Sequence, residues 1–297
     1  ASCLVGSEMC IRDRVRPGGQ RVAAAGAQRV ASRQHAPHIP MTSPTAPALT
    51  EAEQAAFLQS IARVRNAAGR ALRAAQTNAV QGTAAHGTGA IATGQAPDAT
   101  ESAAQAAVDF IAQLHQGLDT VAEQARTNGP QPACQAGCAH CCHLRVEATD
   151  PEVLHIAQHL QTLPSADQAT TLRRLQQHAA AASVGTTRQP CSFLVHDRCA
   201  IYSVRPAACR KAHSLSAAHC AEQSPTIPQN LRLLVDAEAL MAGTALAYRD
   251  QPPPASAHEL NAAVLAALDG TASPPAGALL RWYRGDDGAL ALRGTPP

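Results

Sequence analysis

Aromatic side chains are scarce in this chain of 297 residues, where Phe, Tyr and Trp together account for 2% of the sequence. The hydrophobic core must therefore be built from Ala, Leu, Val and Ile, and alanine-rich apolar content with few β-branched runs favours helices. No apolar run approaches the ~20 residues needed to cross a bilayer, so we expect no membrane partner. The net charge of +2 is too small to indicate a nucleic-acid partner.

Common catalytic motifs are missing as well. The chain contains no Walker phosphate-binding loop, no dinucleotide-binding GxGxxG and no HExxH signature of zinc proteases. Serine and aspartate residues are scattered without the sequence context of a nucleophile. These absences leave open whether the protein is an enzyme.

The first 40 residues lack the apolar segment of a secretory signal. Residues 4–13, LVGSEMCIRD, are similar to one reading frame of a sequencing-library adapter, so we expect residues 1–40 to be a non-native or disordered leader before Met41. An Arg-rich, acid-poor transit peptide is the alternative. Without a secretory signal, the expected location is a reducing cytoplasm, where clustered cysteines more often bind metal or act as catalytic thiols than form disulfides.

Helical spacing of apolar residues recurs through most of the remaining chain. Thr50 and Glu53 form a capping-box pattern that predicts a helix over residues 51–79, and the Thr-Asp-Pro-Glu stretch at 149–152 predicts another helix start. We therefore predict a mainly α protein that carries a small cysteine-rich metal-binding module with short β-strands. Further helices are expected over residues 101–128, 165–177, 228–248 and 257–269.

The predicted domain organisation follows from the breaks between these segments. Residues 41–128 form an N-terminal helical region, in which the segment 82–98, rich in Gly, Ala and Thr, is predicted to be a flexible linker. Residues 129–222 form a cysteine-cluster metal-binding domain. Residues 223–297 contribute C-terminal helices and a loose tail.

Ten cysteines are present, and most of them lie in a single part of the chain. Four fall within CQAGCAHCC, residues 134–142, and the others follow at wider spacings. Thiolates at short loop spacings can converge on one soft cation while the backbone turns around it. The candidate metal ligands are Cys134, Cys138, Cys141, Cys142, Cys191, Cys199, Cys209 and Cys220.

The second group of cysteines lies around PCSFLVHDRCAIYSVRPAACR, residues 190–210. SFLV and CAIY are short strand candidates joined by a tight connection over residues 196–198, and HLRVEA, residues 143–148, is another short strand candidate. Pro206 ends the extended segment and starts a helical turn toward Cys209. The predicted hairpin would fix the position of these thiols.

Cys141 and Cys142 are adjacent, and neighbouring side chains diverge in most backbone conformations. We therefore expect them not to serve one mononuclear site together. Eight thiolates would fill two four-thiolate sites, or one iron–sulfur cluster with spare thiols, and the sequence does not decide between these. Disulfides are the less favoured alternative because of the expected compartment.

Several cationic and imidazole side chains lie close to the cysteines in sequence. Arg205 and Arg210 flank Cys209 and are expected to compensate thiolate charge or to bind an anion. Histidines near the cysteines could be ligands, hydrogen-bond donors behind the ligands, or solvated side chains. These histidines are His140, His143, His196, His213 and His219.

Together these residues resemble a known family. CQAGCAHCCHLRVEAT followed by PCSFLVHDRCAIYSVRPAACR is similar to the YkgJ family of cysteine-cluster proteins, described as a zinc- or iron-chelating domain. The resemblance covers residues 134–220 and implies that the cysteines from Cys134 to Cys209 bind metal, with Cys220 as an eighth member. Three residues separate the first two cysteines here, where the family's general pattern has two.

A related branch contains flagellin lysine N-methylase, which implies an iron–sulfur, S-adenosylmethionine-dependent transfer of methyl groups to protein lysines. The spacing of Cys134, Cys138 and Cys141 also matches the signature of radical S-adenosylmethionine enzymes, but no alternating strand–helix series is present to build their barrel. Two functions therefore stay open. One is a metal-binding protein that holds zinc or iron, including as a four-iron iron–sulfur cluster, and the other is an iron–sulfur protein lysine N-methyltransferase.

Overall fold

The computed structural model describes residues 50–86, 98–182, 189–251, 253–268, 276–286 and 288–290. The predicted leader over residues 1–40 lies outside the described residues. The residues from Thr50 onward form one compact unit. Within the described ranges, no helix is both long enough and apolar enough to cross a bilayer.

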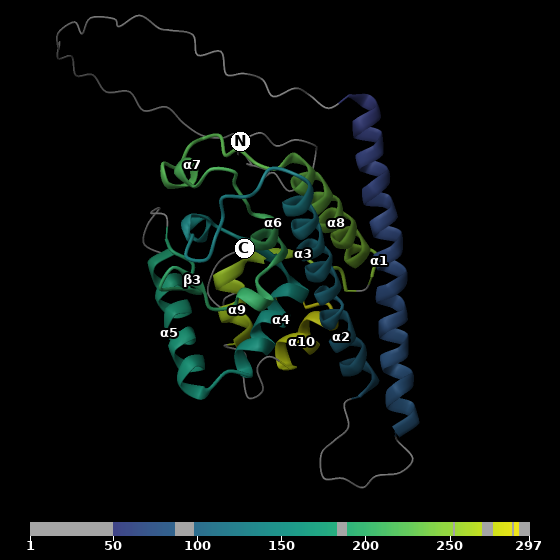
Figure 1. The fold of residues 1–297 in the computed structure, drawn as a ribbon. Coiled ribbons are helices and arrows are strands. Elements are labelled where there is room, and N and C mark those ends of the chain that lie inside the picture. Colours follow the sequence, from purple (N-terminus) through teal and green to yellow (C-terminus); the bar gives the residue numbers. More distant parts are fainter. Residues whose placement is uncertain are drawn as a thin grey trace, which may run out of the picture. The chain divides into compact units, whose positions relative to one another are not determined.

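The fold is mainly α, as the composition predicts (Figure 1). The α-helices of the described part are α1 (Glu51–His86), α2 (Ala99–Asp109), α3 (Ile111–Asn128), α4 (Asp150–Gln161), α5 (Ser165–Ala182), α6 (Ala207–Lys211), α7 (Ala217–Ala221), α8 (Leu231–Arg249), α9 (Leu260–Leu268) and α10 (Ala276–Tyr283). Short 3-10 turns and strands accompany them. These are η1 (His140–His143), η2 (Tyr202–Val204), β1 (Glu147–Thr149), β2 (Leu194–Val195), β3 (Arg198–Cys199) and β4 (Ala257–Glu259).

α1 begins where the sequence predicts but ends later. The backbone N–H of Thr50 donates to Glu53 Oε2 at 2.8 Å, and the backbone N–H of Glu53 donates to Thr50 Oγ1 at 3.3 Å, so the capping box is formed. The helix continues past the predicted end at residue 79 to His86, because each residue added to an existing helix needs only one more backbone hydrogen bond. It thus includes the start of the segment 82–98, of which residues 87–97 are not described.

α1 packs along α2 and α8 (Figure 1). The contact with α8 is closest at Gly243, where an added Cβ would lie 2.5 Å from Val64 Cβ and 2.8 Å from the carbonyl oxygen of Ile61. A glycine at this position therefore allows the two helices to approach each other closely.

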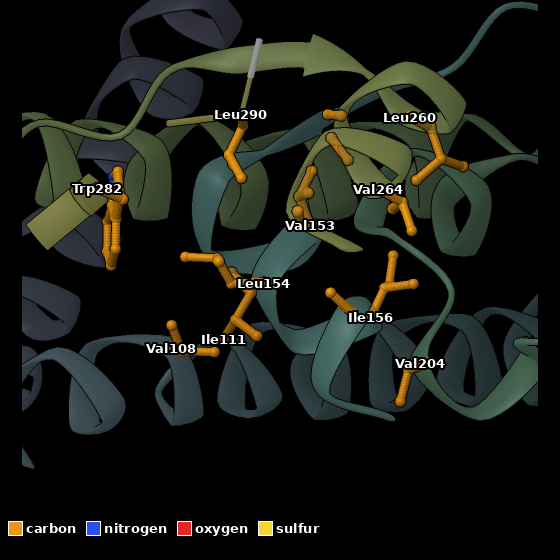
Figure 2. Close-up of a cluster of buried hydrophobic side chains, with 14 of the residues drawn as sticks. Val108, Ile111, Val153, Leu154, Ile156, Val204, Leu260, Val264, Trp282 and Leu290 are labelled. Carbon is orange, nitrogen blue, oxygen red and sulfur yellow. The ribbon is translucent and has the colours of Figure 1, made fainter. Parts of the chain in front are cut away.

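α4 lies in the centre of the hydrophobic core. The capping box of Thr149 and Glu152 starts it, with Pro151 in the first turn, as predicted. Leu154 and Ile156 are completely buried. Figure 2 shows the α4 side chains between Ile111 of α3 on one side and Val264 of α9 on the other. The core is mainly aliphatic, as the shortage of aromatic residues requires, with a few aromatic side chains such as Phe193 and Trp282.

Two elements of the C-terminal part differ from the prediction. Residues 257–259, predicted to start a helix, form β4, which pairs antiparallel with β1 in the register Glu147↔Glu259. The last residues, predicted to be loose, contain α10, whose Trp282 is 4% exposed. β4 pairs with a strand that is distant in sequence, and α10 has only eight residues. Neither element produces a clear periodic pattern of apolar residues, so the sequence did not predict them.

Candidate metal centre

The first four candidate ligands lie on a tight, irregular segment that ends in the 3-10 turn η1. Gly137 has φ +89°, a backbone conformation that side chains other than hydrogen disfavour, and this allows the chain to curl between Cys134 and Cys138. The amide of Cys142 donates to the carbonyl oxygen of Ala139 at 2.9 Å. Ala139 is buried, whereas the four thiols around it are half-buried or exposed.

The adjacent thiols Cys141 and Cys142 both lie on η1. Their mutual side-chain interaction is the largest cause of a lowered pKa at Cys141, to about 6, and of a raised pKa at Cys142. Whether both serve one metal site stays a prediction from the sequence.

The hairpin predicted after Cys191 is present but shorter than expected. β2 and β3 pair antiparallel with Leu194 opposite Cys199. His196 and Asp197 have φ values of 48° and 58°, so they form a two-residue turn of the kind that matches strand twist, while Arg198 belongs to β3. The end of the predicted strand CAIY is instead the 3-10 turn η2.

The hairpin is connected directly to η1. The amide of Cys191 donates to the carbonyl oxygen of Cys142 at 2.8 Å. Phe193, 1% exposed, anchors the hairpin in the core, and its carbonyl oxygen accepts from Ala200 N–H at 2.8 Å. The two groups of cysteines, almost 50 residues apart in sequence, therefore meet at η1.

Asn261 of α9 fixes the start of the hairpin, and sequence reasoning did not identify it. Its Oδ1 accepts from Ser192 N–H at 2.9 Å and from the Cys191 thiol at 3.6 Å, while its Nδ2 donates to Glu259 at 2.7 Å. These contacts fix the orientation of the Asn261 side-chain amide, with Oδ1 toward the hairpin and Nδ2 toward Glu259. Burial, the largest cause, raises the pKa of Cys191 to about 11.

Cys209 lies on α6, whose first turn is held by Glu152 of α4. Glu152 Oε1 accepts from Ala207 N–H at 2.6 Å and lies 3.4 Å from His115 Nε2, and Oε2 accepts from Thr149 N–H at 2.8 Å. Burial alone would raise the pKa of this carboxyl, but the hydrogen bonds from His115, Ala207 and Thr149 hold it below its ordinary value. Burial, followed by the nearby thiols, raises the pKa of Cys209 to about 12.

Cys134 lies near Ser214, and Cys220 lies on α7, which contacts η1. The carbonyl oxygen of Ser214 accepts from Ala133 N–H at 2.8 Å and is 3.9 Å from the Cys134 thiol. α7, which carries Cys220, packs against η1, and Ser216 caps this short helix. Burial is the largest cause of a raised pKa at Cys134, and its nearest thiols add to the increase.

The two arginines near Cys209 contact a carboxylate. Arg210 is buried and donates to Asp119 Oδ2 at 2.6 Å and to the carbonyl oxygen of Arg205 at 2.9 Å. Arg205 stacks on the ring of Tyr202 and has Nη2 at 3.6 Å from Asp119 Oδ1. The carboxylate of Asp119 on α3 therefore binds the two arginines that were expected to bind an anion, and the sequence analysis did not identify it.

Among the nearby histidines, His213 has both ring nitrogens engaged. Its Nδ1 is 2.8 Å from the carbonyl oxygen of Lys211, and its Nε2 accepts from Asn230 N–H at 2.9 Å. His143 and His219 each place Nδ1 near an oxygen, the carbonyl of Ala139 at 3.1 Å and the hydroxyl of Ser216 at 2.8 Å. His213 therefore has a structural role that conflicts with metal ligation.

The eight cysteines from Cys134 to Cys220 are all free thiols. Soft thiol donors in this number suit zinc or iron. Within the described residues, however, no three or more His, Cys, Asp or Glu side chains are already arranged to hold a metal ion. The thiols are thus gathered around η1 without being closed around a common point, and binding would require their side chains to move together.

Comparison with known protein families gives one match in this region. Residues 133–228 match the family CxxCxxCC, described as "Putative zinc- or iron-chelating domain". Searches among curated proteins and among solved structures gave no match. The match covers all eight free cysteines together with α4 and α5 between the two cysteine groups, and it leaves α1 to α3 and α8 to α10 outside.

Proposed function

We propose that residues 134–220 chelate zinc or iron through their eight cysteines, as the YkgJ family does. The observation that carries this proposal is the contact between the two cysteine groups. Cys191 N–H is bonded to the carbonyl oxygen of Cys142, so thiols that are far apart in sequence lie around the same 3-10 turn. The match of residues 133–228 to a zinc- or iron-chelating family supports the same conclusion.

Metal binding would also stabilise this part of the chain. Between residues 131 and 147, all of them described, only Ala139 is buried, so the segment obtains little stability from apolar contacts. In small cysteine-rich modules the free energy of metal binding contributes directly to folding. We therefore propose residues 129–222 as the chelating domain and the helices around it as the framework that positions it.

The thiols and arginines have distinct parts in this proposal. The eight cysteines are the ligands, and Arg205, whose charge opposes the rise that burial causes in the pKa of Cys199, compensates part of the thiolate charge. Arg210 follows Cys209 on α6 and donates to Asp119 and to the carbonyl oxygen of Arg205, just before α6, and it therefore positions Cys209. The free state of all eight thiols fits a reducing cytoplasm as the proposed location.

The metal content of protein purified without oxygen tests this function. We expect stoichiometric zinc, or iron, in the wild-type chain and in the variant Cys10→Ser, whose cysteine precedes the matched residues 133–228 in the sequence. The variants Cys191→Ser and Cys138→Ser should lose metal. Wild-type protein that holds neither zinc nor iron, and takes up neither when it is offered, would overturn the proposal.

The same sample tests the alternative, an iron–sulfur, S-adenosylmethionine-dependent protein lysine N-methyltransferase. A brown protein with acid-labile sulfide would favour an iron–sulfur cluster and exclude a zinc-only module. A colourless protein with stoichiometric zinc would exclude the cluster enzyme. Transfer of a labelled methyl group to a protein lysine would then be sought only in the first case.

A further inference from the structure

Two helices outside the family match hold parts of the second cysteine group. The match covers residues 133–228, whereas α3 ends at Asn128 and α9 begins at Leu260. α3 nevertheless packs against α6, which carries Cys209 (Figure 1), and Asn261 of α9 contacts Cys191. Two of the candidate ligands are therefore supported by residues that the chelating family's match does not include.

The start of α6 is held by α3 and α4 together. Glu152 Oε1 accepts from Ala207 N–H at 2.6 Å and lies 3.4 Å from His115 Nε2 of α3. His115 is four residues before Asp119, so both lie on the same face of α3. This face therefore contacts α6 directly through Asp119 and indirectly through the buried carboxylate of Glu152.

Asp119 is the partner of a buried guanidinium next to Cys209. Arg210 donates to Asp119 Oδ2 at 2.6 Å and to the carbonyl oxygens of Arg205 at 2.9 Å and Ser203 at 2.5 Å. The Arg210 side chain is only 4% exposed, and a buried charge that loses its partner is strongly unfavourable. Without the Asp119 carboxylate, Arg210 is expected to move toward water, and the adjacent Cys209 moves with it.

Asn261 has the corresponding role at the start of the hairpin. Its Oδ1 accepts from Ser192 N–H at 2.9 Å and from the Cys191 thiol at 3.6 Å, and its Nδ2 donates to Glu259 at 2.7 Å. Asn261 is 5% exposed, so water does not readily replace it. Its loss leaves the buried N–H of Ser192 without this acceptor, and the backbone beside Cys191 is then free to shift.

The first cysteine group has supports of another kind. The carbonyl oxygen of Ser214 accepts from Ala133 N–H at 2.8 Å and lies 3.9 Å from the Cys134 thiol. α7, which carries Cys220, packs against η1. These supports all lie within residues 133–228, so contacts from α3 and α9 distinguish Cys191 and Cys209 from Cys134.

We infer that Asp119 and Asn261 are positioning residues of the metal site, Asp119 for Cys209 through Arg210 and Asn261 for Cys191. This inference rests on the proposed chelating function. Neither residue binds the metal itself. Replacing a residue that orients a ligand typically weakens metal affinity about 10–100-fold, because the ligand must then be ordered when the metal binds. The functional unit thus extends beyond the matched residues into α3 and α9.

Alkylation of the metal-free full-length chain by iodoacetamide, measured for each cysteine by mass spectrometry, tests the two positioning roles separately. Asp119→Ala should raise the alkylation rate of Cys209 severalfold and leave that of Cys191 unchanged. Asn261→Ala should do the reverse. The matched control is Glu123→Ala, one turn further along α3, which removes a pairing with Arg126 at 3.6 Å and should change neither rate.

Zinc affinity, measured by competition with a chromogenic chelator, tests whether positioning matters for binding. Asp119→Ala and Asn261→Ala should each bind zinc about tenfold more weakly or worse, whereas Glu123→Ala should bind like the wild-type chain. The Asp119 side chain is 53% exposed, so its replacement leaves the core intact, and this variant decides the question if Asn261→Ala does not fold.

Equal increases in alkylation at Cys191 and Cys209 in each variant would indicate a general loosening and would overturn the inference. Unchanged zinc affinity in the folded variants would overturn it as well, while leaving the chelating function in place. A wild-type chain that binds neither zinc nor iron would instead overturn the chelating function itself.

Discussion

The helices around α4 and the cysteine region beside them obtain their stability in different ways. In α4, Val153, Leu154 and Ile156 are completely buried among side chains of α2, α3 and α9 (Figure 2). In η1 no residue is buried, and the thiols beside it are half-buried or exposed. The first region can fold by burying apolar surface, whereas the second depends on its links to the first and on what its thiols bind.

Those links combine apolar anchors such as Phe193 with buried polar contacts. Glu152 joins α4 to the start of α6, and Asn261 joins α9 to the hairpin. Asp150, which is 5% exposed, joins the start of α4 to His258 of β4 at 2.7 Å. The framework therefore holds the backbone near the thiols in place through buried hydrogen bonds.

Metal removal should have the largest effect, and it should be confined to the cysteine region. Structural zinc contributes roughly 10–16 kcal/mol in small zinc modules, so chelation should release most of the order in residues 134–147 and 189–222. Hydrogen exchange of metal-loaded and chelated protein, compared peptide by peptide, should show lost protection there and unchanged protection in α4. Equal protection in both states would remove the distinction between the two regions.

The next largest effect is expected from the buried link at Glu152. Glu152→Ala leaves the amides of Thr149 and Ala207 and the His115 ring without their acceptor inside the protein, so the free energy of unfolding should fall by about 3 kcal/mol or more. Urea denaturation monitors this loss. The matched control is Glu53→Ala, which removes the same capping-box carboxylate from the exposed start of α1 and should cost far less.

A comparable loss for Glu53→Ala and Glu152→Ala would show that the contact to α6 adds nothing to an ordinary helix cap. Metal affinity is a second measurement that tests the role of Glu152. Since Glu152 positions the helix that carries Cys209, Glu152→Ala should weaken metal binding and Glu53→Ala should not.

Within the helical framework, a smaller effect is expected where α1 crosses α8. Gly243→Ala places a Cβ 2.5 Å from Val64 Cβ, so the helices must separate and stability should fall by about 1–3 kcal/mol although alanine is the better helix former. Gly117→Ala is the control, because its Cβ would meet Leu240 Cδ1 at an ordinary 3.5 Å.

Gly117→Ala should raise stability by about 0.5–1 kcal/mol through helix propensity alone. Thermal unfolding of the two variants gives opposite shifts in Tm if the account of the α1–α8 crossing is right. Metal content should be unchanged in both, because neither glycine lies in the cysteine region.

The smallest expected effect is a pH dependence of the unfolding free energy that arises from the buried carboxylate of Glu152. The pKa of Glu152 is below its ordinary value near 4.5, so the stability that this group contributes is present above about pH 4.5 and is lost as the pH falls through the lowered pKa. The difference in unfolding free energy between the wild-type chain and Glu152→Ala should therefore narrow on acidification. A difference that stays constant from pH 7 down to pH 3 would contradict the assignment.

Sequence reasoning succeeded where local patterns decide the structure. The capping boxes at Thr50 and Thr149 start α1 and α4, and the segment between Cys191 and Cys199 forms a hairpin. These features depend on residues within a few positions of one another, and their side-chain chemistry is readable in the sequence. The helical fold class follows for the same reason.

Predictions from the sequence were wrong or missing where contacts between distant segments determine the structure. β4 exists because it pairs with β1, and α10 is ordered because Trp282 enters the core. The same holds at the candidate site, where Asn261 contacts Cys191 from 70 residues away and Glu152 contacts Ala207 from 55 residues away. A buried polar residue on an otherwise apolar helix face, as Asn261 is on α9, is the signal that could have identified one of them.

The central claim is that thiols from both cysteine groups bind a metal ion together. X-ray absorption at the zinc or iron edge, on protein purified without oxygen, tests it most directly because it reports the atoms bonded to the metal. The account predicts a shell of sulfur at about 2.3 Å for zinc, which loses sulfur in Cys138→Ser and in Cys191→Ser alike. A shell dominated by nitrogen or oxygen, or one that neither substitution changes, would contradict it.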